Sequence, residues 1–208
     1  MKKTILIGLS LLFSLCLNAQ RAGQTSYGIS VGGNIKDHYS VVQVSSTGLR
    51  YHDEEVAGQI SATAEVSKFL TDGFRLTFSA VYGLYIPDSP SISRVHALAI
   101  GPSLAFYCKL ADDFYLAPEI GAFATWGWTK VKNSAPNAVT TSSAPVGMLL
   151  VASLLSFEYK VSDKMGIAFS AGSLEINRTP QSDTSDKVVT KTNISLNGTS
   201  SVGLRFYF

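Results

Sequence analysis

The chain has 208 residues, of which 17 are basic and 15 acidic. Two of the basic residues, Lys2 and Lys3, and none of the acidic ones lie in the first 19 residues, so the remainder is formally neutral. This balance gives no basic footprint for a nucleic acid. Beyond Cys16 only Cys108 remains, so the sequence predicts no cysteine-based metal site, no metal ion and no cofactor.

The first 19 residues are typical of a cleaved secretory signal peptide. A positive start at Lys2 and Lys3 is followed by an apolar run over residues 5–17 and by the small residue Ala19. The run is too short for a membrane-spanning helix, which takes about 20 apolar residues. We therefore predict export, cleavage after Ala19, and one domain over residues 20–208.

The exported part alternates between apolar and polar residues with period two, which is typical of β-strands. In residues 74–86, Leu76 and Phe78 fall on one face, and Arg75 and Thr77 fall on the other. Similar patterns predict eight strands, at about 25–35, 56–68, 74–86, 95–109, 114–128, 146–159, 165–173 and 194–208.

The predicted connections alternate between short and long. Tight polar turns are expected at 70–73, 110–113 and 161–164, and longer loops near 36–55, 87–93, 129–145 and 174–190. An even number of strands with this alternation is typical of a transmembrane barrel with short periplasmic turns and longer extracellular loops. The predicted fold class is therefore all-β, an eight-stranded antiparallel up-and-down transmembrane β-barrel.

The two faces of the strands support the membrane interpretation. The polar face consists largely of Gly, Ala, Ser and Thr, which fit a narrow lumen, so the large apolar residues are predicted to face lipid. Aromatic residues at both rims predict a girdle, with Trp126 and Trp128 towards one rim and Phe69, Phe74, Phe114, Tyr159 and Phe208 towards the other. We expect bulges at Pro102 and Pro118, because proline removes a ladder hydrogen bond.

Five charged residues share the predicted lumen face in the periplasmic half of the barrel: Glu65, Arg75, Glu119, Glu158 and Arg205. Charges in a narrow lumen are costly unless they are paired, and arginine favours bidentate pairing. We expect each arginine to bridge at least one carboxylate, and the resulting network to plug the lumen.

The chain ends in an apolar strand rather than a polar tail. Its last segment has Ser201, Gly203, Phe206 and Phe208 at the positions of the C-terminal signal that the outer-membrane barrel-assembly machinery recognises. Over residues 20–208 the chain resembles the small eight-stranded outer-membrane barrels of the OmpA and OmpX type, also described as outer-membrane β-barrel domain or porin-family proteins. The resemblance implies a Gram-negative outer membrane, with lipid and lipopolysaccharide as surroundings, and implies no catalytic residue.

Three functions remain open at this point. The leading one is a structural or surface-interaction role, in which loops around 37–54, 130–141 and 175–191 meet an unidentified extracellular ligand. The second is a lipid A-modifying acyltransferase, for which His38, Asp88 and Ser89 lie in the first two outer loops. The third is a narrow diffusion channel. Basic residues near the outer rim are candidates to pair with lipopolysaccharide phosphates, namely Arg94, Lys130 and Lys132.

Overall fold

The computed structural model describes residues 22–45, 48–87, 92–132, 139–143, 146–182 and 188–208, so the predicted signal peptide lies outside it. The described residues form twelve strands: β1 (Thr25–Ser45), β2 (Gly48–Thr71), β3 (Phe74–Pro87), β4 (Ile92–Phe106), β5 (Cys108–Ala111), β6 (Phe114–Leu116), β7 (Glu119–Lys132), β8 (Val139–Ser143), β9 (Gly147–Ser153), β10 (Leu155–Ser162), β11 (Met165–Ser182) and β12 (Val188–Tyr207). No helix in these ranges is long and apolar enough to cross a membrane.

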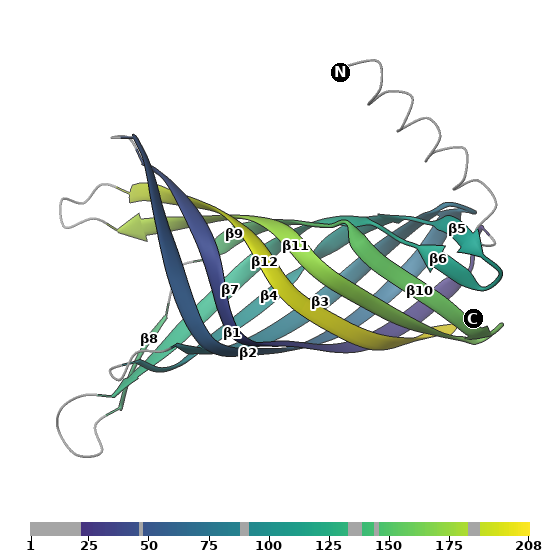
Figure 1. Cartoon of the computed structure of the whole chain (residues 1–208), viewed down its shortest axis with the longest axis horizontal. Helices are drawn as coiled ribbons and strands as arrows, with labels where there is room; N and C mark the ends of the chain where they lie inside the picture. Colours follow the sequence, from purple (N-terminus) through teal and green to yellow (C-terminus); the bar gives the residue numbers. More distant parts are fainter. Residues whose placement is uncertain (1–21, 46–47, 88–91, 133–138, 144–145, 183–187) are drawn as a thin grey trace.

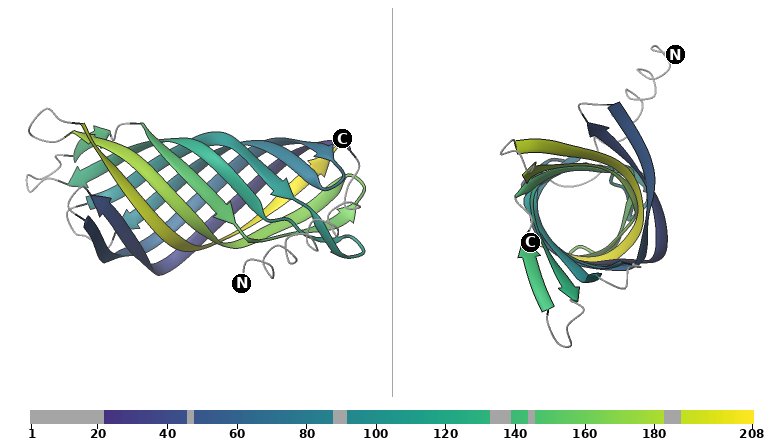
Figure 2. Two further views of the ribbon diagram at one scale, coloured as in Figure 1. Left: turned by 90° about the horizontal axis from the view of Figure 1, so that it is seen from above. Right: turned by 90° about the vertical axis from the view of Figure 1, so that its left-hand side faces the viewer.

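The strands close into a ring. Each strand in the order β12-β1-β2-β3-β4-β7-β9-β11 pairs with the next, and β11 pairs in turn with β12. Both pairings of β12 are antiparallel. The short strands β5, β6 and β10 extend the wall at one end, and β8 pairs with β7 at the other (Figures 1 and 2). The predicted eight-stranded antiparallel barrel is confirmed.

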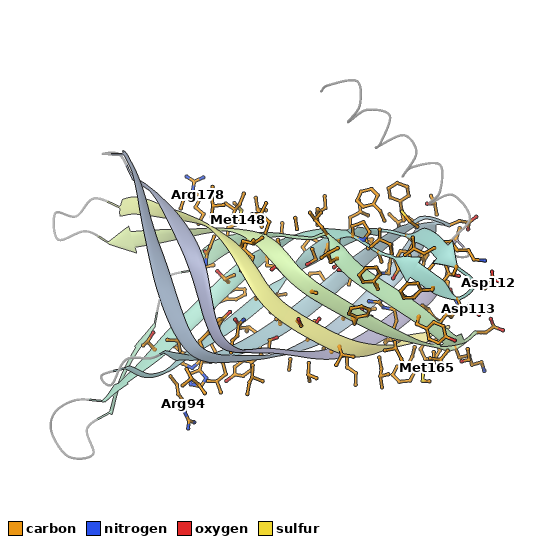
Figure 3. The ribbon with its side chains drawn as sticks, viewed as in Figure 1. Arg94, Asp112, Asp113, Met148, Met165 and Arg178 are labelled. Atoms are coloured by element: carbon orange, nitrogen blue, oxygen red, sulfur yellow. The ribbon has the colours of Figure 1, made fainter. Side chains whose placement is uncertain are left out.

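One end of the barrel carries the short connections. Two-residue turns at 72–73, 112–113 and 163–164 join neighbouring strands there, as predicted, with Asp113 in the left-handed region at φ 61°. The backbone N–H of Phe208 donates to the carbonyl of Thr25 over 2.9 Å, so β12 also finishes at this end. We call it the turn end, and the opposite end the hairpin end; Figure 3 labels Asp112 and Asp113 at the turn end.

At the hairpin end, strands continue through most of the predicted loops. β1 and β2 keep one register from Thr25↔Lys68 to Ser45↔Gly48, and β11 pairs with β12 as far as Ser182↔Val188. The predicted loops at 36–55, 129–145 and 174–190 are therefore wrong in extent. Two adjacent strands supply each other's backbone hydrogen bonds whatever their side chains, so Ser- and Thr-rich sequence does not end them. The connection at 87–93 agrees better, since β3 ends at Pro87 and β4 begins at Ile92.

Large apolar side chains point outward and polar ones inward, as predicted. On β3, Leu76 and Phe78 are exposed, whereas Arg75, Thr77 and Ser79 are buried. On β12, Leu204 and Phe206 are exposed, and Leu196 is 71% exposed. Similar outward side chains follow β1, β2, β7, β9 and β11, so they surround the barrel.

The expected bulges at Pro102 and Pro118 are corrected by the register. Pro102 pairs with Phe78, and the β4–β7 register is the same on either side of it, so no bulge occurs there. Pro118 lies in the gap between β6 and β7, and the inward phase continues across that gap from Tyr115 through Ala117 to Glu119.

The irregularities lie on the neighbouring strands instead. Two residues, 117–118, separate the paired positions Leu116 and Glu119, whereas three residues, 154–156, separate their partners Phe157 and Ser153, which makes a bulge around Leu154. The N–H of Ala117 donates to the carbonyl of Ser156 over 2.7 Å across this bulge. A second register shift, between β11 and β12, falls at Gly172, whose φ is 73°. Because Pro118 cannot donate, the partner strand adjusts around it.

Candidate functional site: a charged layer in the lumen

The lumen near the turn end is filled by aromatic rings. Phe69, Tyr107, Tyr115 and Tyr207 are buried there, together with Ala105 and Ala117. Phe69 is fully buried and lies with its ring centroid 5.1 Å from that of Tyr107. Its predicted place in the outer girdle is therefore wrong, because its strand position is inward and close packing with the tyrosines fills the barrel.

Arg75, at the start of β3, lies directly on this aromatic cluster. Its guanidinium carbon is 5.1 Å from the centroid of the Tyr107 ring, a cation–π contact. Nη2 lies 3.1 Å from Oε2 of Glu119, and Nη1 lies 3.5 Å from Oε2 of Glu158. Nε donates to Oγ1 of Thr77 over 3.1 Å. The guanidinium is thus held by partners from β7 and β10, by Tyr107 between β4 and β5, and by Thr77 of its own strand.

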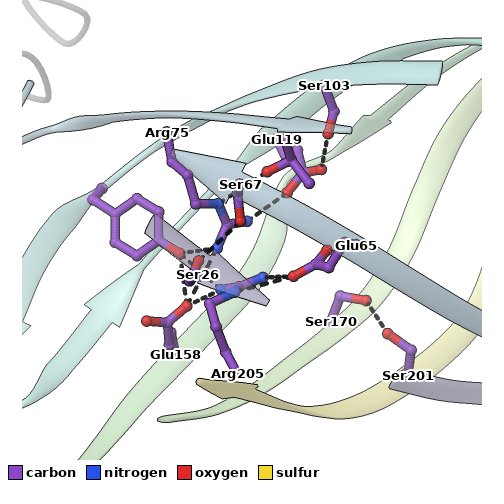
Figure 4. Close-up of polar contacts among 12 residues, drawn as sticks. Ser26, Glu65, Ser67, Arg75, Ser103, Glu119, Glu158, Ser170, Ser201 and Arg205 are labelled. Carbon is purple, nitrogen blue, oxygen red and sulfur yellow. Dashed lines mark hydrogen bonds and ion pairs between the residues drawn. The ribbon is translucent and has the colours of Figure 1, made fainter. Parts of the chain in front are cut away.

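Arg205, on β12, approaches the same point from another part of the barrel wall. Nε donates to Oε1 of Glu65 over 3.0 Å, and Nη2 contacts the same oxygen. Nη1 donates to the Tyr107 hydroxyl over 2.9 Å and also contacts Glu158. Each of the two arginines therefore contacts two carboxylates (Figure 4).

Glu158, on β10, is the common partner of both arginines. Its Oε2 accepts from the Tyr107 hydroxyl over 2.6 Å, and its Oε1 accepts from the hydroxyl of Tyr207. The residue is 1% exposed. A carboxylate buried this deeply is tolerated only when cations and donors satisfy it, and Glu158 has both.

The structure brings together all five charged residues that the sequence places on the lumen face, from β2, β3, β7, β10 and β12. Sequence reasoning missed Tyr107, Tyr207 and Ser103. The Ser103 hydroxyl donates to Glu119, and the Tyr207 hydroxyl donates to Glu158. The Tyr107 hydroxyl contacts both arginines as well as Glu158. Their inward phase was the available signal, since Tyr207 lies two residues after Arg205.

The predicted girdle residues other than Phe69 lie on the outer face. Phe74 meets Phe106 edge to face at 4.9 Å, Phe114 stacks on Phe157 at 5.7 Å, and Tyr159 is exposed. Trp126 is exposed towards the hairpin end, where Trp128 stacks on His96 at 5.4 Å. Aromatic side chains therefore occur on the outer face towards both ends.

The remaining candidates are placed only in part. Ser201 and Gly203 face the lumen, whereas Phe206 and Phe208 are exposed on the outer face; recognition by an assembly machinery stays a prediction. The backbone of His38 pairs with Glu55 in the β1–β2 ladder, but its side chain, Asp88 and Ser89 lie outside the described residues. Among the described residues no group of His, Cys, Asp and Glu is arranged to hold a metal ion.

No protein-family model matches the chain, and a search of curated proteins finds no similar sequence. Similar solved structures include Neisserial surface protein A (14% identity, 88% of this chain and 97% of that chain, TM-score 0.44) and Ail, the attachment invasion locus protein of Yersinia pestis (14%, 90% and 99%, TM-score 0.47). A third is the outer membrane protein OprG from Pseudomonas aeruginosa (11%, 91% and 98%, TM-score 0.46). At these identities and TM-scores the likeness reveals no function, and the fold rests on the strand pairing itself.

Proposed function

We propose that the protein is an outer-membrane β-barrel with a structural or surface-interaction role, presenting its hairpin end to the exterior. The observation that carries the proposal is the distribution of side chains between the two faces. Large apolar residues cover the outer face, and serine, threonine, arginine and glutamate line the lumen. A water-soluble barrel has the reverse arrangement, with its apolar face inside. An outer face of large apolar side chains is suited to contact with the hydrocarbon core of a lipid bilayer.

The orientation follows from the connections. Outer-membrane barrels have short periplasmic turns and longer extracellular segments. The turn end therefore faces the periplasm, and the β1–β2 and β11–β12 hairpins reach outside. Arg94 and Arg178 are exposed towards the hairpin end and project from the outer wall in Figure 3, a position suited to lipopolysaccharide phosphates.

The charged layer and the aromatic cluster favour a closed scaffold over a diffusion channel. Arg75, Glu158 and Arg205 are nearly fully buried in the middle of the lumen and hold one another through ion pairs. An eight-stranded barrel leaves little room beyond its own side chains. We infer that these side chains form a plug at the periplasmic side, and that the β1–β2 and β11–β12 hairpins carry the interactions of the protein.

The membrane assignment is tested by placing arginine on either face. Phe78→Arg puts a charge on the outer face and is expected to cost on the order of 2 to 4 kcal/mol of folding free energy near the bilayer midplane. Thr63→Arg is the control, because Thr63 lines the lumen cavity and the new cation has Glu65 two residues away on the same face. Thr77 is unsuitable as a control, since it is buried against Arg75.

The measurement is the free energy of unfolding of each variant from lipid vesicles. A clear loss for Phe78→Arg with a smaller loss for Thr63→Arg supports the proposal. Equal losses in both variants, or recovery of the native protein in the soluble fraction of cells, would contradict it.

A further inference from the structure

The lumen holds a partly open cavity of about 480 Å³ on the hairpin side of the charged layer. The cavity exists because the inward positions beyond the layer are small, among them Ser61, Ser79, Ala99 and Thr125. Binding sites for small molecules usually have volumes of about 300 to 1,000 Å³. The volume therefore suits a small organic ligand, with Arg75 and Arg205 in their ion pairs at its floor.

Five aromatic residues contribute to the lining of this cavity: Tyr85, Phe123, Trp126, Phe157 and Phe169. Of these, Tyr85 of β3 and Phe123 of β7 occupy inward positions of their strands. Each ring folds over a glycine of its own strand. A Cβ atom added at Gly83 would lie 3.0 Å from Cε2 of Tyr85, and one added at Gly121 would lie 2.6 Å from Cε2 of Phe123. Because glycine has no side chain, each ring can lie flat against the barrel wall at this position. The other face of each ring is then available to a ligand in the cavity.

Carboxylates outnumber cations in the lining. Among the described residues that line the cavity, four are carboxylates and two are guanidiniums: Glu65, Glu119, Glu158 and Glu175 against Arg75 and Arg205. Both guanidiniums are engaged with the carboxylates of the layer. The electrostatic preference of these residues is therefore for a cation.

Glu175 supplies charge at the depth of the aromatic rings. Tyr85, Phe123 and Glu175 lie nine to eleven residues beyond Phe74, Phe114 and Met165, the residues that follow the three short turns. Glu175 accepts a hydrogen bond from Ser173 over 2.8 Å, and it lines the same cavity as Tyr85. β3 and β11 lie opposite each other in the ring, so Tyr85 and Glu175 line the cavity from opposite walls.

We propose that this cavity binds a small organic ammonium cation. The faces of Tyr85 and Phe123 supply cation–π attraction, and Glu175 supplies the countercharge. A bare metal ion would leave most of the 480 Å³ unfilled. An anion would meet the carboxylate excess. The proposal rests on the lumen alone and is independent of the membrane assignment, so the two can fail separately.

The test is a titration with choline and with its uncharged isostere 3,3-dimethyl-1-butanol. The protein is folded in octyl glucoside micelles, which contain no choline, and binding is followed by amide chemical shifts of lumen residues and by calorimetry. We expect choline to bind and the isostere not to bind. Glu175→Gln should weaken choline binding about tenfold. Asp112→Asn is the matched control, because Asp112 is exposed in a turn at the far end.

Several outcomes would overturn the proposal. These are the absence of choline binding, equal binding of the isostere, unchanged affinity in Glu175→Gln, and equal weakening in Asp112→Asn. If Glu175→Gln does not fold, Tyr85→Leu replaces it as the test. That variant removes one aromatic face and keeps an apolar side chain, so unchanged choline affinity in it would overturn the proposal as well.

Discussion

At the scale of single residues, Glu158 and Tyr107 explain how charge is tolerated inside the barrel. Glu158 receives donors from two arginines and two tyrosines. The Tyr107 hydroxyl is also an acceptor for both guanidiniums. Replacing one of these residues leaves the remaining charges buried without a partner. The loss of folding free energy is then larger than the difference between the intact ion pairs and an apolar core.

Arg205→Ala is therefore expected to lower the free energy of unfolding by roughly 3 to 5 kcal/mol, the usual cost of breaking a buried ion pair. Among the described residues it removes the ion-pair partner of Glu65, and it leaves Glu158 with Arg75 as its cation. Arg178→Ala is the control, since Arg178 is exposed on the outer wall. Urea titration of the folded barrels in vesicles provides the measurement. An Arg205→Ala variant as stable as the parent would show that the layer is merely hydrated.

At the scale of elements, the register shift between β11 and β12 at Gly172 decides which residues of β11 enter the lumen. Before Gly172 the inward positions are Gly166, Ala168 and Ser170, and after it they are Ser173 and Glu175. Between the pairs Ala171↔Ser200 and Ser173↔Asn197, β11 has one residue opposite two on β12. The alternation of β11 reverses at this point, so Glu175 faces the cavity and Leu174 faces outward. Gly172 permits this because its φ of 73° lies in the left-handed region.

Gly172→Ala should consequently destabilise the barrel by about 1 to 2 kcal/mol, the cost of the left-handed conformation for a residue with a Cβ atom. Gly172→Asn is the matched comparison and should cost less, because asparagine adopts this conformation more readily. Both are measured by equilibrium unfolding from vesicles. If alanine proved no worse than asparagine, backbone strain at the bulge would not be the determining factor.

At the scale of the whole molecule, the lumen has two zones with different roles. The turn end is filled by Phe69, Tyr107, Tyr115 and Tyr207 beneath the charged layer. The hairpin half keeps the cavity of about 480 Å³. In the proposed orientation the barrel is thus closed towards the periplasm and holds its free volume towards the exterior.

A closed periplasmic half predicts that the intact protein shows no steady conductance in planar lipid bilayers. Ion pairs and aromatic packing must be broken before a continuous water path forms, and each broken buried pair is costly. Insertion is checked in parallel by the shift in gel mobility between unheated and boiled samples. Stable, well-resolved current steps from the unmodified protein would refute the plug and favour the channel alternative.

The sequence by itself determined the features that depend on local periodicity. Alternation with period two gave the strands and the two faces, as at Leu76 and Phe78 against Arg75 and Thr77. Polar dipeptides such as Asp112–Asp113 marked the turns. The inward phase also placed Glu65, Glu119 and Glu158 with the arginines, because a strand's facing is preserved wherever its register is unbroken.

Only the tertiary structure decided the features that depend on pairing between strands. Backbone pairing with a neighbouring strand extends β1, β2, β11 and β12 through polar segments that the sequence predicts as loops. The bulge opposite Pro118 lies on the partner strand, and the bulge at Gly172 turned Glu175 into the lumen. Phe69, Tyr107 and Tyr207 became core residues because ring closure brings distant strands within contact distance. Such contacts depend on register and closure, which no single segment specifies.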